Sequence, residues 1–299
     1  MGVEASRAYV DAPITDLSAA TRAAARAAEH WGADRPVLLR HGMNAIFASG
    51  ELVLRVATPS VPARASIELA EALGSQGIRV PAPRRADVVV DGPMSVTAWE
   101  RITESNAPVD WVEVGAMVHQ VHELDHGALP AAIPIPSPSV LPWWDFDALV
   151  ERAGGALDGP AHDGLMAVID RHRGWSRFGD TVLCHGDVHP GNVMMSTEGP
   201  VLLDWDLLCR APAGWDHGPL MTLHDRWGGD ADVYPAFAEG YGQSFVDDAA
   251  AVAFAELRLV AATLMRVVAG ISNPDARPEA ERRLQYWRGD ADAPSWAAQ

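Results

Sequence analysis

The chain has 299 residues, of which 48% are hydrophobic, so it is long enough for one large domain or two ordinary ones with a sizeable core. Its formal net charge of −17 argues against nucleic acid as a partner, because phosphate backbones are bound by basic surfaces. The acidic charge would favour cationic small molecules through long-range steering, although solubility alone also explains it.

Cysteine content and hydropathy indicate the compartment. Cys184 and Cys209 are the only cysteines, too few for a disulfide framework, and they are typical of a reducing interior. No apolar run approaches the ~18 residues needed to span a bilayer, and the N-terminus lacks the basic and apolar regions of a signal peptide. We therefore expect a cytoplasmic protein with no membrane partner. Either a monomer or a homodimer is compatible with the sequence.

The first hundred residues alternate between helix and strand patterns. An alanine-rich helix is expected over 18–31, and a second helix with an apolar face over 65–74. Short apolar runs predict strands over 36–40, 45–48, 52–57, 86–90 and 94–99. Because Arg55 alternates with the apolar Leu54 and Val56, we expect its side chain on the opposite face of its strand.

Beyond residue 102 the periodicity becomes mainly helical. Helices are expected over 109–124, 145–153, 165–172, 234–245 and 249–270. Within this region, residues 181–206 read instead as a strand, a loop containing glycines, and a hairpin with strands over 193–195 and 201–203. The hairpin carries Asn192 at one end and Asp204 at the other.

The spacing in this stretch predicts its chemistry. Protein kinases place a base aspartate in H-R-D-x-x-x-x-N, and the asparagine and a later aspartate hold magnesium. Here Asp187 follows His185 and Gly186, Asn192 comes at the same interval from Asp187, and Asp204 follows the hairpin. Magnesium prefers oxygen ligands, which an amide beside a carboxylate provides. Asp187 is left to face an acceptor hydroxyl.

Other interpretations of these residues are weaker. Aspartate and asparagine in loops often make turns, but that would not explain two spaced elements together. A zinc hydrolase site made of His185, Asp187 and His189 is possible in principle, yet it gives Asn192 and Asp204 no role.

The H-G-D-x-H-x-x-N pattern, followed by Asp-Trp-Asp, resembles the aminoglycoside phosphotransferase and choline kinase family of small-molecule kinases. The residues that carry the resemblance are His185, Gly186, Asp187, His189, Asn192, Asp204 and Asp206. It implies an α+β, bilobal, protein-kinase-like fold. A small antiparallel β-sheet lobe over 1–102 would bind nucleotide, and a hinge near 99–103 would lead to a larger helical lobe over 103–299 with the acceptor site.

The resemblance also implies a nucleotide site. Arg55 would grip the phosphates where kinases use lysine, a residue that this chain lacks, and either Glu68 or Glu71 would pair with it. Asn44 resembles the asparagine of the family's G-x-x-N turn. Main-chain groups of Glu100 and Ile102 would meet the base of ATP, with GTP left open.

Further roles follow for the phosphate and the acceptor. Asn192 and Asp204 would hold Mg²⁺, while Asp206 and His189 would lie near the transferred phosphate or the substrate. His185 and Asp216 would be structural. The acidic and aromatic residues that could cradle an amine, or form only a polar surface loop, are Asp225, Trp227 and Asp230.

The sequence therefore predicts Mg²⁺-dependent transfer of the γ-phosphate of ATP to a hydroxyl of a small molecule. We place an aminoglycoside or other cationic antibiotic first, and a choline-like amino alcohol, a sugar or another metabolite next. A nucleotide-binding pseudokinase is an alternative of a different class. The intact Asp187, Asn192 and Asp204 count against it, and the missing lysine counts for it.

Overall fold

The computed structural model describes residues 11–125, 127, 129–177 and 179–297. These residues form two compact units, each assembled from separate stretches of the chain. Within the described residues, the first unit contains 11–110, 123–136 and 190–208, and the second contains 111–122, 137–189 and 209–297. The lobe boundary expected at a hinge near 99–103 stays a prediction.

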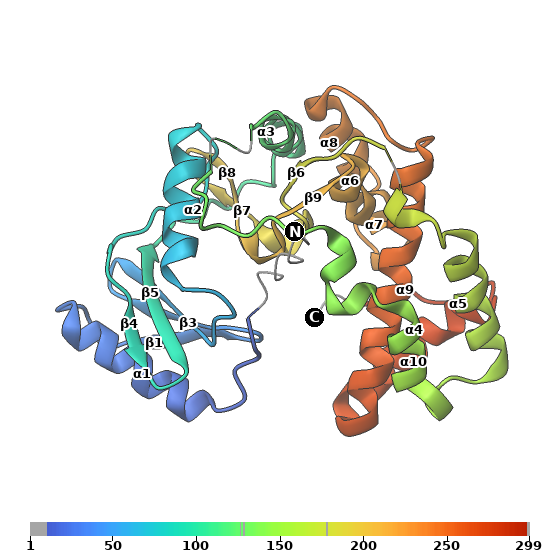
Figure 1. The fold of residues 1–299 in the computed structure, drawn as a ribbon, viewed down its shortest axis with the longest axis horizontal. Coiled ribbons are helices and arrows are strands. Elements are labelled where there is room, and N and C mark those ends of the chain that lie inside the picture. The colour runs from blue at the N-terminus through green and yellow to red at the C-terminus, as the bar shows by residue number, and fades with distance from the viewer. Residues whose placement is uncertain (1–10, 126, 128, 178, 298–299) are drawn as a thin grey trace, which may run out of the picture. The chain divides into compact units, whose positions relative to one another are not determined.

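The first unit is built on an antiparallel sheet of five strands in the order β1-β2-β3-β5-β4. Strands β1, β3, β4 and β5 of this sheet are labelled in Figure 1. The strands are β1 (Val37–His41), β2 (Ala45–Ser49), β3 (Leu52–Ala57), β4 (Val89–Asp91) and β5 (Met94–Glu100). Glycine fits the tight turns, since Gly50 and Gly92 have φ of 60° and 61°, where other residues are strained. The strand expected over 86–90 begins only at Val89, because its continuous pairing with β5 runs from Val89 to Asp91 and is preceded only by an isolated bridge between Pro83 and Trp99.

An alanine-rich helix covers one face of this sheet. Helix α1 (Leu17–His30) is capped at its N-terminus by Asp16, whose side chain accepts a hydrogen bond from Ala19 N at 2.9 Å. Its buried face consists of small side chains, which let the helix approach the sheet closely. The shared core includes Ala20, Ala23, Ala24, Ala27, Phe47, Leu54, Val56, Val96 and Ala98. Helix α2 (Arg64–Ser75) follows β3.

The predicted hairpin belongs to the first unit. It consists of β7 (Val193–Ser196) and β8 (Gly199–Leu202), which pair in register across the turn. Leu203 N donates to Asn192 O at 2.8 Å, so the two ends of the hairpin lie side by side. This pairing brings the residues that precede β7 and follow β8 to one place.

The second unit is mainly helical, and several of its helices pack around one long apolar helix. Its helices are α3 (Trp111–His122), α4 (Phe146–Ala153), α5 (Gly159–Arg171), α6 (Gly214–Met221), α7 (Leu223–Trp227), α8 (Val233–Tyr241), α9 (Ala249–Ser272) and α10 (Arg277–Trp287). Helices α4, α5, α6 and α10 all pack on α9. Strands β6 (Val182–Cys184) and β9 (Cys209–Ala211) form a small antiparallel pair. In the described part of the chain, no helix combines the length and apolar character needed to cross a bilayer.

Candidate active site

Asp187 lies in the second unit, in the loop that follows β6. Its carboxylate accepts a short hydrogen bond from Arg258 of α9 and lies 3.3 Å from His189 Nε2. Its N–H donates to His185 Nδ1 at 3.2 Å, and His185 is fully buried. Burial acts to raise the pKa of Asp187, but Arg258 and His189 hold it well below its ordinary value. The carboxylate is therefore anionic and fixed in orientation.

A buried carboxylate braces this loop from α6. Asp216 is fully buried, and its two oxygens accept from His185 N at 2.8 Å and from Gly186 N at 2.7 Å. Burial raises the pKa of Asp216, but its hydrogen bonds, that of His122 above all, lower it below its ordinary value. Asp216 thus contacts the loop that it was expected to brace.

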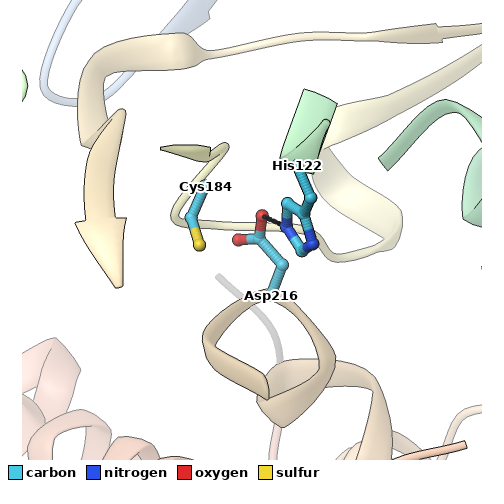
Figure 2. A group of neighbouring side chains, drawn as sticks. All are labelled: His122, Cys184 and Asp216. Carbon is cyan, nitrogen blue, oxygen red and sulfur yellow. Dashed lines mark hydrogen bonds and ion pairs between the residues drawn. The ribbon is translucent and has the colours of Figure 1, made fainter. Parts of the chain in front are cut away.

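His122, Cys184 and Asp216 form a compact buried group with possible metal-ligand atoms within 4.8 Å of one another (Figure 2). Each of these side chains already has a hydrogen-bond partner. His122 Nε2 lies 3.1 Å from Asp216 and His122 Nδ1 lies 2.9 Å from the Tyr241 hydroxyl. The Cys184 thiol points to Ala211 O at 3.6 Å. Within this group it is Asp216 that contacts the loop, through the N–H groups of His185 and Gly186, while His122 holds Asp216.

The first unit contains a pocket of about 780 Å³. It is lined by seven of the residues that the resemblance places around the nucleotide: Asn44, Arg55, Glu100, Ile102, Asn192, Asp204 and Asp206. Apolar side chains of the sheet and the hairpin line it as well, among them Ile46, Val53, Met194 and Leu203. Such a pocket can take a flat base between apolar surfaces and a charged group at its polar end.

Arg55 is the centre of the polar end. As expected from strand alternation, its side chain lies on the opposite face from the buried Leu54 and Val56. Arg55 Nη2 donates to Asp11 at 2.8 Å and to Asp206 at 2.5 Å.

Asn44 completes the contacts around Arg55. With its amide oriented to satisfy both neighbours, Asn44 accepts from Arg55 Nη2 at 2.7 Å and donates to Asp11 at 3.2 Å. The side chain of Asn44 therefore joins the arginine to one of its acidic partners.

The acidic residues here suit a divalent cation. Burial, reinforced by the charges of Asp204 and Asp11, raises the pKa of Asp206 to about 7 against the opposing effect of Arg55. Burial also raises the pKa of Asp11. Here buried carboxylates carry more negative charge than the neighbouring cations balance. The carboxylate oxygens and the amide oxygen of the buried Asn192 are ligands of the kind that Mg²⁺ prefers. The chemistry of these residues therefore fits the expected Mg²⁺.

Asp204 has an unusual backbone. Its φ of 61° and ψ of 70° place it in the left-handed region, and among the described residues no other non-glycine residue has a positive φ. Such a conformation costs roughly 1–3 kcal/mol and persists where the surrounding structure imposes it, often at functional sites. The left-handed backbone of Asp204, just after the hairpin, thus sets the position of this carboxylate and lowers the stability of the fold.

At the end of β5, only some of the main-chain groups expected to bind the nucleotide base are available for it. Glu100 N donates to Ala82 O at 2.8 Å, and the Glu100 side chain accepts from Ala82 N at 2.9 Å. Of the main-chain groups of Glu100, we therefore expect only the carbonyl oxygen to contact the nucleotide base. Among the described residues, the main chain of Ile102 makes no hydrogen bond, so its N–H is available to a ligand.

The expected pairing of Arg55 with Glu68 or Glu71 is wrong. Glu68 pairs with Arg64 at 3.0 Å, four positions away on α2, and Glu71 is exposed. The residues of α2 that line the pocket are Ser66, Leu69 and Ala70. By the helical period, Glu68 and Glu71 lie on a different side of the helix, away from the pocket. Asp11 and Asp206 contact Arg55 instead.

A model of the phosphotransferase enzyme family matches residues 32–257 of the chain. The chain belongs to this family. The match includes the pocket of the first unit from Leu39 onwards and the loop of Asp187, whereas Asp11 and Arg258 lie outside the matched range.

Solved structures show the same fold for this phosphotransferase. One is spectinomycin phosphotransferase APH(9)-Ia in complex with ADP and spectinomycin, with a TM-score of 0.63, 16% identity, and coverage of 91% of this chain and 94% of that chain. Another is the GDP complex of aminoglycoside 2'-phosphotransferase-IIIa, with a TM-score of 0.63, 14% identity and coverage of 86% and 93%. A choline/ethanolamine kinase family protein from Mesorhizobium loti has a TM-score of 0.60, 17% identity and coverage of 85% and 87%. The α+β, protein-kinase-like fold is thereby confirmed. No curated protein matches the sequence.

The aromatic member of the expected amine cradle is engaged within the phosphotransferase itself. The guanidinium of Arg283 lies 5.0 Å from the centre of the Trp227 ring, and Trp296 packs edge-on against the same ring at 5.3 Å. Asp225 and Asp230 are exposed. A cation of the chain therefore occupies one face of Trp227, where a substrate amine was expected.

Two site residues of the phosphotransferase were missed by sequence reasoning. Asp11 lies in a short segment before α1, and Arg258 lies in the long apolar helix α9. Arg258 Nη1 also donates to Gly186 O at 2.9 Å, and its guanidinium lies 5.9 Å from the centre of the Trp215 ring. A charged residue within an apolar helix was the one available signal, and it does not identify the partner.

Replacing Arg258 by methionine should lower kcat about tenfold to a hundredfold, the effect of losing a charge-assisted hydrogen bond. The pH profile should change as well. In the unmodified enzyme, Asp187 has a depressed pKa and is anionic across the pH range of most assays. Without Arg258, burial should raise this pKa. The activity of the variant should therefore fall as the pH drops from 8 to 5.5, because Asp187 becomes protonated. Arg258→Lys keeps the charge but not both contacts, so it should keep the profile of the unmodified enzyme with a reduced kcat. Equal losses at all pH values in Arg258→Met would contradict this role.

Proposed function

We propose that this phosphotransferase moves the terminal phosphate of ATP or GTP to a hydroxyl of a small molecule, with Mg²⁺. The observation that supports this best is the pocket of the first unit, where Arg55, Asn192, Asp204 and Asp206 share one lining with apolar residues of the sheet. The solved structures with ADP and GDP belong to proteins of similar fold and are consistent with either nucleotide.

Each residue has a role in the proposed reaction. The acceptor oxygen forms a bond to the γ-phosphorus, the bond from that phosphorus to the β–γ bridging oxygen breaks, and the nucleoside diphosphate leaves. Asp187 orients the acceptor hydroxyl and takes up its proton. Because Arg258 holds its pKa low, Asp187 is a weak base and accepts the proton only as the new bond forms. Positioning therefore dominates its contribution.

The phosphates would be held by groups of the first unit. Arg55 would neutralise their charge, and Asn192 and Asp204 would be the ligands of Mg²⁺. When bound, the ion would neutralise charge on the phosphates. Asp206 would lie beside the transferred phosphate, and the Glu100 carbonyl and Ile102 N–H would bind the base.

For the acceptor, we place an aminoglycoside or other cationic antibiotic first, because spectinomycin and aminoglycoside phosphotransferases share the fold and the chain is strongly acidic. An amino alcohol, a sugar or another metabolite is the alternative, since folds of this kind accept varied substrates. A pseudokinase is disfavoured by the fixed, anionic Asp187.

A panel assay tests the proposal. Release of ADP or GDP should be stimulated by at least one member of a panel of aminoglycosides, spectinomycin, macrolides, choline and sugars. Chelation of Mg²⁺ by EDTA should abolish this release, and added Mg²⁺ should restore it. Nucleotide binding without turnover with any acceptor would favour the pseudokinase. Failure to bind either nucleotide with Mg²⁺ would contradict the proposal as a whole.

A further inference from the structure

We infer that Asp11, in the segment before α1, is the acidic residue that holds Arg55 in place for the nucleotide phosphates. The resemblance would assign this role to a glutamate of α2. This inference rests on the proposed function, because it concerns how the proposed phosphate-binding residue is oriented.

Helix α2 cannot supply the partner from the face that it turns to the pocket. That face offers Ser66, Leu69 and Ala70, none of which carries a charge. Residues two positions away along a helix lie about 200° around it, so Glu68 points away from the side on which Ser66 and Ala70 lie. Glu68 accordingly pairs with Arg64 at 3.0 Å, and 33% of its side chain is exposed.

Asp11 has the properties of a dedicated partner. Its side chain is only 4% exposed, and its Oδ2 lies 2.8 Å from Arg55 Nη2. The neighbouring residue anchors it, because Ala12 N donates to Thr58 O at 2.9 Å, directly after the strand that carries Arg55. Asn44 then links Asp11 to Arg55. The segment before α1 is therefore tied to the end of β3 at the point where the arginine needs an anion.

A partner of this kind has a physical purpose. A free arginine side chain loses conformational entropy when it is fixed, and a pre-oriented guanidinium avoids that loss upon binding. Asp206 is a second carboxylate on Arg55 among the described residues; it is two positions from Asp204 and is proposed to face the transferred phosphate. Of these two carboxylates, Asp11 is thus the one that stays with Arg55 when the nucleotide is bound.

The binding of ATP with Mg²⁺, measured by isothermal titration calorimetry, tests the inference. Asp11→Asn keeps the size of the side chain and should weaken binding about tenfold to a hundredfold, the effect of one charge-assisted hydrogen bond. Glu68→Gln and Glu71→Gln are the matched controls and should change the Kd less than about threefold. Weaker binding in either glutamine variant with unchanged binding in Asp11→Asn would overturn the inference. So would tighter binding in Asp11→Asn, which would mean that Asp11 competes with the phosphates.

A double-mutant cycle separates positioning from a general effect on the fold. In an Arg55→Gln background, Asp11→Asn should have no further effect on the Kd, because the group that it orients is gone. Losses that multiply in the double variant would assign Asp11 a merely structural role. If the unmodified protein binds neither ATP nor GTP with Mg²⁺, the proposed function fails and this inference with it. If it binds ATP and the affinity is insensitive to Asp11→Asn, only the inference fails.

Discussion

Asp187→Asn should lower kcat by about 10²–10⁴-fold, the usual contribution of a positioned general base. Asparagine has the same shape and can still accept a hydrogen bond from Arg258, but it cannot take the proton of the acceptor hydroxyl. The Kd for ATP with Mg²⁺ should change less than about threefold, since the residues proposed to bind nucleotide line the pocket of the first unit. Initial rates of ADP release with an accepted substrate measure the first effect, and calorimetry measures the second.

A matched control is available on α5. Asp163 carries the same carboxylate, and its side chain is 85% exposed, so Asp163→Asn should keep the turnover of the unmodified enzyme. Normal turnover in Asp187→Asn with its true acceptor would remove Asp187 from the mechanism. A large loss of ATP affinity in that variant would instead show that Asp187 acts on the nucleotide.

Asp204→Asn and Asp204→Gly should both reduce kcat about a thousandfold, because a ligand of Mg²⁺ contributes several kcal/mol to the stability of the transition state. Stability should move in the opposite direction. Glycine adopts the left-handed backbone of this position without strain, and either change removes one charge from beside Asp206 and Asp11. We therefore expect the Tm without nucleotide to equal or exceed that of the unmodified protein.

Thermal shift with and without ATP and Mg²⁺ measures this combination. The unmodified protein should gain stability from ATP with Mg²⁺ by mass action, and the Asp204 variants should gain much less. A variant that is inactive because it is misfolded would show a lowered Tm, which the prediction excludes. Unchanged activity in Asp204→Asn would contradict the assignment of this carboxylate to the metal.

Local sequence patterns were sufficient where neighbouring residues decide the outcome. Apolar runs on either side of a turn predicted the hairpin, and the pairing of its strands necessarily brings its two ends together at Asn192 and Leu203. Alternation along β3 predicted the face on which Arg55 lies, because successive side chains of a strand point in opposite directions. The extent of β4 was less predictable, since a short edge strand depends on its pairing with β5.

By itself, then, the sequence determined the family, the hairpin and the direction of Arg55, because motif spacing and strand alternation are local properties. The tertiary structure decided which charges meet. Asp11 and Asp206 lie 44 and 151 positions from Arg55, and Arg258 lies 71 positions from Asp187. Ion pairs form wherever the packed backbone brings opposite charges together away from water, so no periodicity along the chain identifies them. Their partners could be found only once the fold was known.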